Sequence, residues 1–162
     1  MRKPKVAVVL GSNSDLPTME EGLKAFRDFG VPYELKIFSA HRSPALVHSF
    51  AKSAEKRGTK VIIAGAGGAA HLAGVIASLT RLPVVGVPME TQSLKGIDSL
   101  FSTVQMPSGV PVATMAIGKA GAKNAAIFAL QILGITDSKI AKKLIAFKKK
   151  LAAEVAAKNL KT

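Results

Sequence analysis

Short apolar segments alternate with segments of helical character along most of this chain. The predicted strands cover residues 5–10, 33–38, 60–64, 83–87 and 111–117. The predicted helices cover about 17–29, 44–57, 69–79, 98–104 and 120–133. Strands this short and apolar, each followed by a helix, are typical of a parallel sheet that is buried on both faces. The sequence therefore predicts an α/β fold built as a three-layer sandwich.

The last segment, about 137–158, is predicted to be an additional amphipathic helix. Its apolar residues recur at three- and four-residue spacing: Ile140, Leu144, Phe147, Leu151 and Val155. The other face is basic, since residues 139–162 hold eight lysines and one acid. We expect a solvated face here, with attraction for polyanions such as nucleic acid as the alternative. Whether this helix packs on its own sheet or on a neighbouring subunit stays open on the sequence.

The length and composition favour one globular domain over residues 1–162, with its core at about 5–134. The chain has no cysteine, which excludes disulfides, thiolate catalysis and cysteine-ligated metals and suits a cytoplasmic protein. No apolar run is long enough for a signal-peptide core or a membrane span. One tyrosine and no tryptophan make stacking surfaces scarce, so a nucleic-acid partner is not expected.

The loop after the second predicted strand, Ser39-Ala40-His41-Arg42-Ser43-Pro44, holds the first candidates for chemistry. Strand ends in open α/β sheets are where ligands bind. His41 offers an imidazole, which exchanges protons near neutral pH, and Arg42 offers a permanent cation beside it. Such a pair can move a proton next to a bound anion, a task that folding alone does not require.

Two further loops follow predicted strands and open helices. Residues 11–15 read Gly-Ser-Asn-Ser-Asp, where a helix start would attract phosphate, with simple capping as the alternative. Residues 65–71 read Gly-Ala-Gly-Gly-Ala-Ala-His, which suits either close approach to a ligand or tight strand-to-helix packing. His71 is expected in the first turn of the next helix. The glycine spacing of this turn also matches a dinucleotide-binding pattern, in which Glu90, 20 residues beyond Ala70, would be the acidic residue. This interpretation is discounted, because the turn is not the first βα turn and Pro88 separates Glu90 from its strand.

The three loops all follow strands of one parallel sheet, so we expect them at the same edge. Serines, an arginine and helix starts favour a phosphorylated ligand, and the histidine supplies acid–base chemistry. Three histidines and no cysteine leave little for a metal site. The residues by themselves favour an enzyme that acts on a small sugar phosphate or nucleotide by proton transfer, without a metal.

Five runs taken in order resemble one enzyme family more specifically than any run alone. They are Gly-Ser-Asn-Ser-Asp (11–15), Ser-Ala-His-Arg-Ser-Pro (39–44), Gly-Ala-Gly-Gly-Ala-Ala-His-Leu (65–72), Asp-Ser-Leu (98–100) and Val-Gln-Met-Pro-Ser-Gly-Val-Pro-Val-Ala-Thr (104–114). Over about residues 5–134 the chain resembles the phosphoribosylaminoimidazole carboxylase catalytic subunit family, in its N5-carboxyaminoimidazole ribonucleotide mutase branch (class I PurE). Ala73 and Val75 stand where a Pro and a Met are usual, which predicts altered packing with activity retained.

The resemblance implies a flavodoxin-like or Rossmann-like parallel sheet and a step of de novo purine (IMP) biosynthesis. N5-carboxyaminoimidazole ribonucleotide would be converted to 4-carboxyaminoimidazole ribonucleotide, without ATP, metal or organic cofactor. The resemblance also implies a cytoplasmic homo-oligomer, an octamer whose sites are shared between neighbours. Functional coupling to the ATP-dependent synthetase that forms the unstable carbamate is a further expectation.

The resemblance also implies roles for individual residues. The implied substrate-binding residues are Ser12, Asp15, Ser39, Arg42, Gly67, Gly68, Ala69 and His71. Those of the first two loops would hold phosphate and ribose, and the glycine turn would approach the imidazole and the carboxylate. His41 would be catalytic, since carboxylation at ring carbon C4 requires that the C4 proton leave.

Three other functions stay open on the sequence. Direct carboxylation of aminoimidazole ribonucleotide by CO2 belongs to another branch of the same family, although residues 11–15 and 65–71 favour the mutase. A flavin- or nucleotide-binding module without catalysis is an alternative from another class, as is a polyanion-binding protein acting through the lysine-rich helix. Neither of these last two explains His41 beside Arg42.

Overall fold

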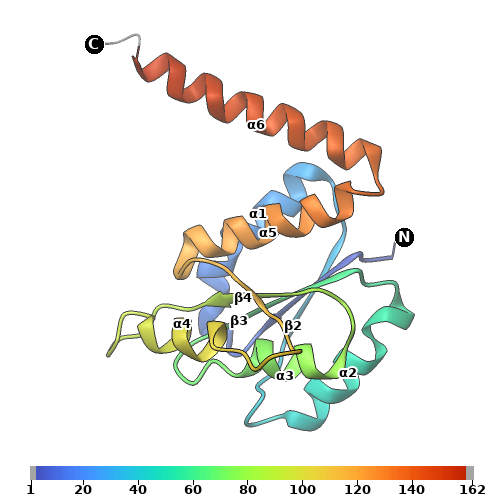
Figure 1. Cartoon of the computed structure of the whole chain (residues 1–162), viewed down its shortest axis with the longest axis vertical. Coiled ribbons are helices and arrows are strands. Elements are labelled where there is room, and N and C mark those ends of the chain that lie inside the picture. Colours follow the sequence, from blue (N-terminus) through green and yellow to red (C-terminus); the bar gives the residue numbers. More distant parts are fainter. Residues whose placement is uncertain (1–2, 160–162) are drawn as a thin grey trace. The chain divides into compact units, whose positions relative to one another are not determined.

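A parallel five-stranded sheet forms the centre of the protein, whose structure, a computed structural model, describes residues 3–159 (Figure 1). The strands are β1 (Val6–Leu10), β2 (Tyr33–Ile37), β3 (Val61–Ala66), β4 (Val84–Pro88) and β5 (Ala113–Thr114). Their order is β2-β1-β3-β4-β5, with every neighbouring pair parallel. This is the strand order of flavodoxin-like folds, so the predicted α/β architecture is confirmed.

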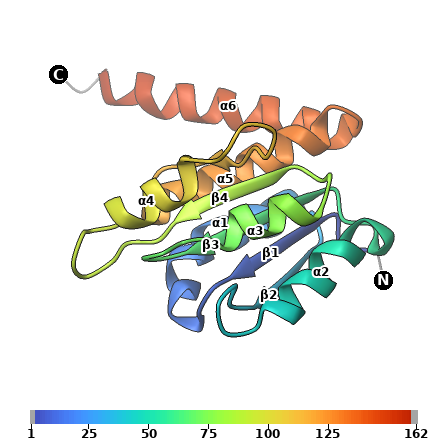
Figure 2. The same cartoon turned by 60° about the horizontal axis from the view of Figure 1, so that its bottom comes forward.

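Helices cover both faces of this sheet (Figure 2). The helices of the described residues are α1 (Leu16–Phe29), α2 (Pro44–Arg57), α3 (Leu72–Leu79), α4 (Ile97–Val104), α5 (Gly118–Gly134) and α6 (Ser138–Asn159), with a short 3-10 helix, η1 (Asn13–Asp15), before α1; those that cover the sheet belong to residues 3–129. Helices α2 and α3 pack on the face of the sheet that carries Ala7, Val9 and Ile62. Helix α1 and the first part of α5 lie on the opposite face (Figures 1 and 2).

The sequence signals for helix ends are confirmed at α1 and α2. Both helices carry a proline in their first turn, where a missing N–H costs nothing. Both end at a glycine in the left-handed region, Gly30 with φ 67° and Gly58 with φ 100°. These endings return the chain to the sheet, where β2 and β3 begin.

The prediction for the region 65–71 is wrong at two points. Strand β3 continues through Gly65 and Ala66, which pair with Val87 and Pro88, so these two residues belong to the sheet rather than to the turn. Helix α3 begins only at Leu72, so the helix predicted from residue 69 starts too early. The residues before Leu72 form tight turns instead, because the N–H groups of Ala70 and His71 donate to the carbonyls two residues back, each at 2.8 Å. His71 consequently lies just before α3, not in its first turn.

Two other expectations also need correction. The helix predicted over residues 98–104 begins one residue earlier, so Asp98 lies inside the first turn of α4, where its carboxylate accepts a hydrogen bond from the Thr91 hydroxyl at 2.8 Å. The residue that precedes α4 is Gly96, with φ 91°. The strand predicted over residues 111–117 is only two residues long as β5. Pro111, which has no N–H to donate to a ladder, favours this late start.

The end of α5 and helix α6 form a separate compact unit from residue 130 onward. The Asp137 carboxylate accepts hydrogen bonds from the N–H groups of Lys139 and Ile140 at 3.1 and 3.3 Å, and so caps α6. Of the predicted apolar stripe, Ile140 and Leu144 are buried, whereas the side chains toward the end of the helix are exposed. Whether the exposed part of α6 packs on a neighbouring subunit stays open. Within residues 3–159 no helix is both long and apolar enough to span a bilayer.

Candidate functional site

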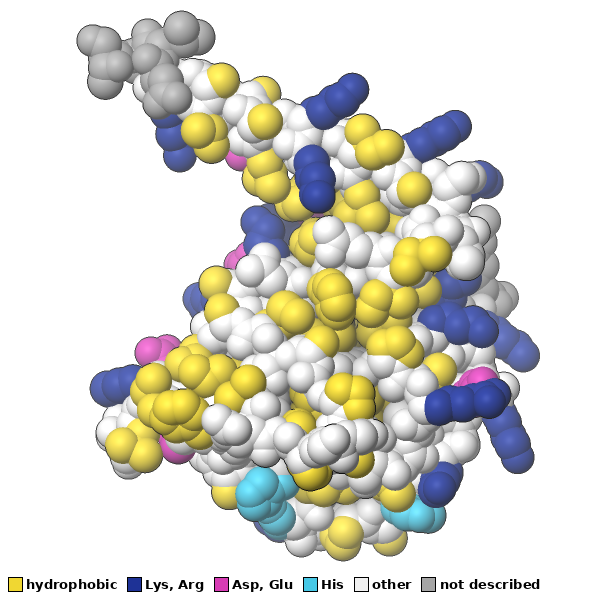
Figure 3. Space-filling view, in the orientation of Figure 1, with side chains coloured by type: hydrophobic (Ala, Val, Ile, Leu, Met, Phe, Trp, Pro, Cys, Tyr) yellow, Lys and Arg dark blue, Asp and Glu magenta, His cyan; other side chains and the backbone are white. Residues whose placement is uncertain are grey.

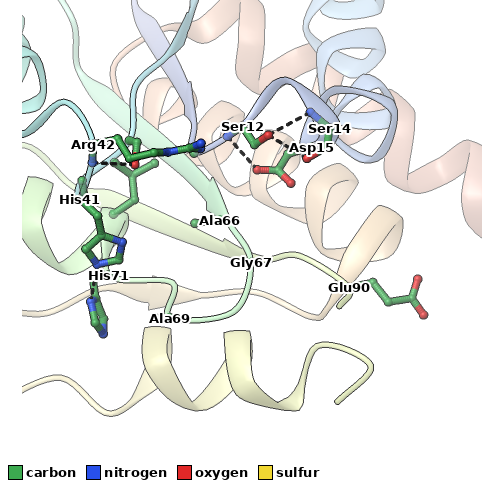
Figure 4. A pocket seen from close by; sticks show the side chains of 14 residues that line it. Ser12, Ser14, Asp15, His41, Arg42, Ala66, Gly67, Ala69, His71 and Glu90 are labelled. Carbon is green, nitrogen blue, oxygen red and sulfur yellow. Dashed lines mark hydrogen bonds between the residues drawn. The ribbon is translucent and has the colours of Figure 1, made fainter. Parts of the chain in front are cut away.

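A pocket of about 440 Å³ lies at the carboxyl ends of four neighbouring strands (Figure 4). Its walls come from the loops after β1, β2, β3 and β4, as expected for this topology. The lining residues are Gly11, Ser12, Ser14, Asp15, Ser39, Ala40, His41, Arg42, Ala66, Gly67, Ala69, His71, Leu72 and Glu90. Most of these side chains are polar, so the pocket suits a polar or charged ligand.

The loop after β1 folds into a capping box. The Ser12 side-chain oxygen accepts the N–H of Ser14 at 3.3 Å, and the Ser12 N–H donates to the Asp15 carboxylate at 3.1 Å. The hydroxyl oxygens of Ser12 and Ser14 also lie within hydrogen-bond distance of each other, at 2.8 Å. The Ser12 hydroxyl makes a long contact with the Asn13 side-chain oxygen at 3.4 Å, which a phosphorylated ligand in the pocket could replace with a shorter bond.

Asp15 is the acidic side chain of this loop, and its surroundings alter its titration. Burial raises the pKa of the Asp15 carboxyl above its ordinary value of 3.8, while hydrogen bonds from the Ser12 N–H and the Ser14 hydroxyl act in the opposite direction. The ionised carboxylate is therefore held in a place that partly disfavours its charge. A ligand hydroxyl that donates to this carboxylate would relieve that penalty.

The loop after β2 is a tight turn held by hydrogen bonds between its own residues. The Ser39 N–H donates to the Ser43 hydroxyl oxygen at 2.9 Å, and the Ser43 hydroxyl donates back to the Ser39 carbonyl at 3.0 Å. The Arg42 N–H donates to the Ser39 hydroxyl oxygen at 3.1 Å. His41 and Arg42 are thereby presented, exposed, at the tip of the turn.

Arg42 differs from the other arginines of the described residues. Arg27, Arg57 and Arg81 each form an ion pair with a glutamate, whereas no carboxylate within residues 3–159 pairs with Arg42. Its side chain extends toward Ser12 (Figure 4). An unpaired guanidinium beside serine hydroxyls is well suited to bind a phosphate group.

The two histidines predicted from separate loops meet at the pocket. Nε2 of His41 lies 2.8 Å from Nδ1 of His71, and the two rings are nearly perpendicular at 84°. One nitrogen of this contact must carry the proton and the other must accept it. The pair is therefore a short path along which a proton can be shared, at the edge of a site that also holds a cation.

The sequence predicted most of this pocket. Eight of the nine predicted residues line it, and Gly68 does not: its N–H donates instead to the Ser99 hydroxyl oxygen at 2.9 Å. The lining residues that sequence reasoning had not named as site residues are Gly11, Ser14, Ala40, Ala66, Leu72 and Glu90. Glu90 follows β4, so its place at the same sheet edge was a usable signal, although its carboxylate points away from the other labelled side chains (Figure 4). Within the described residues, no three histidines, cysteines or acids gather as metal ligands would.

Comparisons with known proteins agree on one family. Residues 5–154 match the AIR carboxylase family. A protein from Pyrococcus horikoshii named N5-carboxyaminoimidazole ribonucleotide mutase is 57% identical over 153 residues, which cover 94% of this chain and 85% of the relative. A mutase of the same name from Thermotoga maritima is 55% identical over 94% of this chain and 88% of the relative.

A solved structure agrees with these sequence relatives. The crystal structure of PurE from Treponema denticola is similar with a TM-score of 0.87 and 28% sequence identity, over 98% of each chain. The similarity extends over nearly the whole chain. On these grounds, this chain belongs to the AIR carboxylase family.

Proposed function

We propose that this chain interconverts N5-carboxyaminoimidazole ribonucleotide and 4-carboxyaminoimidazole ribonucleotide in de novo purine biosynthesis. The observation that carries this proposal is one pocket that joins the His41–His71 pair to the unpaired Arg42. Relatives named as mutases at 51–57% identity support the same reaction. The proposal needs no cofactor, because proton transfer and anion binding are what these side chains supply.

The first two loops are suited to hold the ribonucleotide. Arg42 and the Ser12 hydroxyl would bind the phosphate, with Ser39 nearby as a further hydroxyl. The Asp15 carboxylate would accept hydrogen bonds from ribose hydroxyls. The nucleotide would then lie across the sheet edge, with its imidazole toward the turn that contains Gly67 and Ala69.

The reaction moves a carboxyl group and one proton within the substrate. The bond between N5 and the carboxylate carbon breaks, N5 takes a proton from a protonated side chain, and the CO2 so formed is held in the pocket. The electron-rich ring carbon C4 then attacks CO2, and the C4 proton leaves so that the ring regains its aromaticity. Because N5 gains a proton before C4 loses one, a single group that first donates a proton and then takes one back suffices.

His41 is the side chain best placed for this proton. With Nε2 of His41 donating to Nδ1 of His71 across the 2.8 Å contact, Nδ1 of His41 serves the substrate: it gives its proton to N5 and then holds a lone pair for the C4 proton. When His41 takes the C4 proton, its Nε2–H bond to His71 becomes a charge-assisted hydrogen bond and stabilises the cation. His71 would thus orient His41 as well as contact the substrate.

The proposal includes a homo-oligomer, an octamer as the resemblance implies, formed from second copies of this chain. Four large apolar side chains on α4 and the turn before it support such contacts, since they are 45–58% exposed: Leu94, Ile97, Phe101 and Val104. Figure 3 shows this apolar patch over α4. Patches of this kind on soluble proteins mark interaction surfaces.

A cytoplasmic location and coupling to the carbamate-forming synthetase complete the proposal. The chain's lack of cysteine suits a cytoplasmic location.

An ultraviolet assay separates the mutase from the direct carboxylase that the family's description also suggests. Purified protein is mixed with fresh N5-carboxyaminoimidazole ribonucleotide, without ATP or metal, and in parallel with aminoimidazole ribonucleotide plus bicarbonate. We expect rapid formation of the 4-carboxy product from the carbamate alone. Product only from the second mixture would assign the chain to direct carboxylation, and no product from either would reject both.

The replacement His41→Asn tests the proton carrier. Asparagine fills similar space but cannot accept and return a proton, so we expect kcat to fall by roughly 10²-fold or more, while substrate binding measured by calorimetry is retained. His48→Asn is the matched control, because His48 is exposed on α2 outside the pocket. Turnover of His41→Asn at the normal rate would show that another group moves the proton.

The replacement Asp15→Asn separates stability from binding. Since burial raises the pKa of the Asp15 carboxyl, the folded state holds this proton more tightly than the unfolded state, and the stability so contributed is lost as pH rises above 3.8. The variant should therefore unfold at a higher denaturant concentration than the parent at pH 7, with the difference vanishing near pH 3.8. Its KM should rise roughly tenfold through the lost carboxylate.

The exposed Asp28 of α1 provides the control, Asp28→Asn, which should change neither the unfolding midpoint nor the KM. A parent protein more stable than Asp15→Asn at pH 7 would mean that the hydrogen bonds from Ser12 and Ser14 outweigh burial.

A further inference from the structure

Ser99 is a buried polar residue of α4 whose hydroxyl bonds to the pocket's turn. The residue is 0% exposed. Its hydroxyl oxygen accepts the N–H of Gly68 at 2.9 Å, across 31 positions of sequence. A buried hydroxyl that accepts a distant backbone N–H restricts the position of that peptide, because the enclosed hydroxyl oxygen has no water to replace the bond.

The Gly68 peptide lies in a turn that has little other support. Residues 67–71 belong to neither β3 nor α3. The Gly68 carbonyl accepts the Ala70 N–H at 2.8 Å, which is a contact within the turn itself. The Ser102 hydroxyl lies 3.2 Å from this carbonyl but 2.7 Å from the Asp98 carbonyl, so its single proton favours Asp98. Ser99 thus makes the stronger hydrogen bond between α4 and the turn.

Helix α4 is itself anchored to the loop after β4. The Thr91 hydroxyl donates to the Asp98 carboxylate at 2.8 Å and accepts the N–H of Gly96 at 3.1 Å. The buried Thr103 hydroxyl donates to the Ser99 carbonyl at 2.7 Å, within the helix. Ser99 therefore stands on a helix whose first turn is bonded to the loop at the sheet edge. Its hydrogen bond to Gly68 consequently holds the turn in a fixed position relative to the sheet.

Three residues that line the pocket flank Gly68 in this turn. Gly67 precedes it, and Ala69 and His71 follow. A shift of the Gly68 peptide would move the ring of His71 and lengthen its 2.8 Å contact with His41. The chain of contacts consequently runs from Ser99 through Gly68 and His71 to the proposed proton carrier.

We infer that Ser99 is a positioning residue for the mutase site: it holds the Gly68 peptide so that the turn faces the imidazole carboxylate and His71 stays paired with His41. This inference rests on the proposed function for its kinetic consequence. Its structural part, the Ser99–Gly68 hydrogen bond that orders the turn, holds independently of which reaction the site performs. The residue touches no substrate and acts only through the turn.

The replacement Ser99→Ala tests the inference, with Thr103→Ala as the matched control. Both remove a buried hydroxyl from α4, but only Ser99 bonds to the turn. We expect kcat/KM of Ser99→Ala to fall roughly tenfold to a hundredfold, since small misplacements in an active site have effects of this size. The loss should fall on kcat, and Thr103→Ala should keep the parent's kcat at a comparable loss of thermal stability.

Two spectroscopic measurements keep the test independent of turnover. In the unsubstituted protein the Gly68 N–H should exchange slowly with solvent deuterium, and in Ser99→Ala it should exchange rapidly. The ¹⁵N shifts of the His41 and His71 rings should change in Ser99→Ala and stay constant in Thr103→Ala. Rapid Gly68 exchange in the unsubstituted protein, or unchanged ring shifts in a folded Ser99→Ala, would overturn the inference. Absence of mutase activity in the unsubstituted protein would instead count against the proposed function.

Discussion

The parallel pairing of β1 with both β2 and β3 sets the position of every group in the pocket. Leu10, the last residue of β1, lies opposite Ile37 and Gly65, so the three following loops begin side by side, at about the 5 Å spacing of neighbouring strands. The ladder continues past the strands, because the Gly11 N–H donates to the Gly65 carbonyl and the Phe38 N–H donates to the Leu10 carbonyl, both at 2.9 Å. The loops thus start from fixed points, and apolar burial of the central strands keeps those points in place.

Within this frame, most polar contacts of the site are local to one loop. Ser12 and Asp15 close the first loop, and Ser39 and Ser43 close the second. The contacts between separate elements are fewer: His41 with His71, and Ser99 with Gly68. Local contacts shape each loop, whereas these two contacts set the distance between groups that must act together. If the turn moved away, the buried Ser99 hydroxyl would lose its partner at a cost of about 1–3 kcal/mol, which opposes such a shift.

The limits of sequence reasoning follow from the same distinction. Apolar periodicity, together with Pro17 and Gly30 at the ends of α1, predicted most elements because these signals are local. The order of loops after strands also predicted that His41 and Arg42 would meet the first loop at one edge. The early start assigned to α3 arose because small residues before an apolar run look like a helix opening, whereas Ala70 and His71 form tight turns that no sequence pattern marks. The 2.8 Å contact between His41 and His71, 30 residues apart, depends on strand register and turn geometry together, and no local pattern encodes it.

Retention of the carboxyl group inside the pocket is the central claim of the proposed chemistry, and an isotope experiment tests it most directly. N5-carboxyaminoimidazole ribonucleotide labelled with ¹³C in its carboxylate is converted in an excess of unlabelled bicarbonate, and the product is read by ¹³C NMR before uncatalysed decomposition becomes appreciable. A closed site in which CO2 is recaptured at once predicts that the 4-carboxylate keeps its label. A label diluted to the isotopic composition of the surrounding bicarbonate would contradict the account, because CO2 would then have left the pocket and a different molecule would have entered.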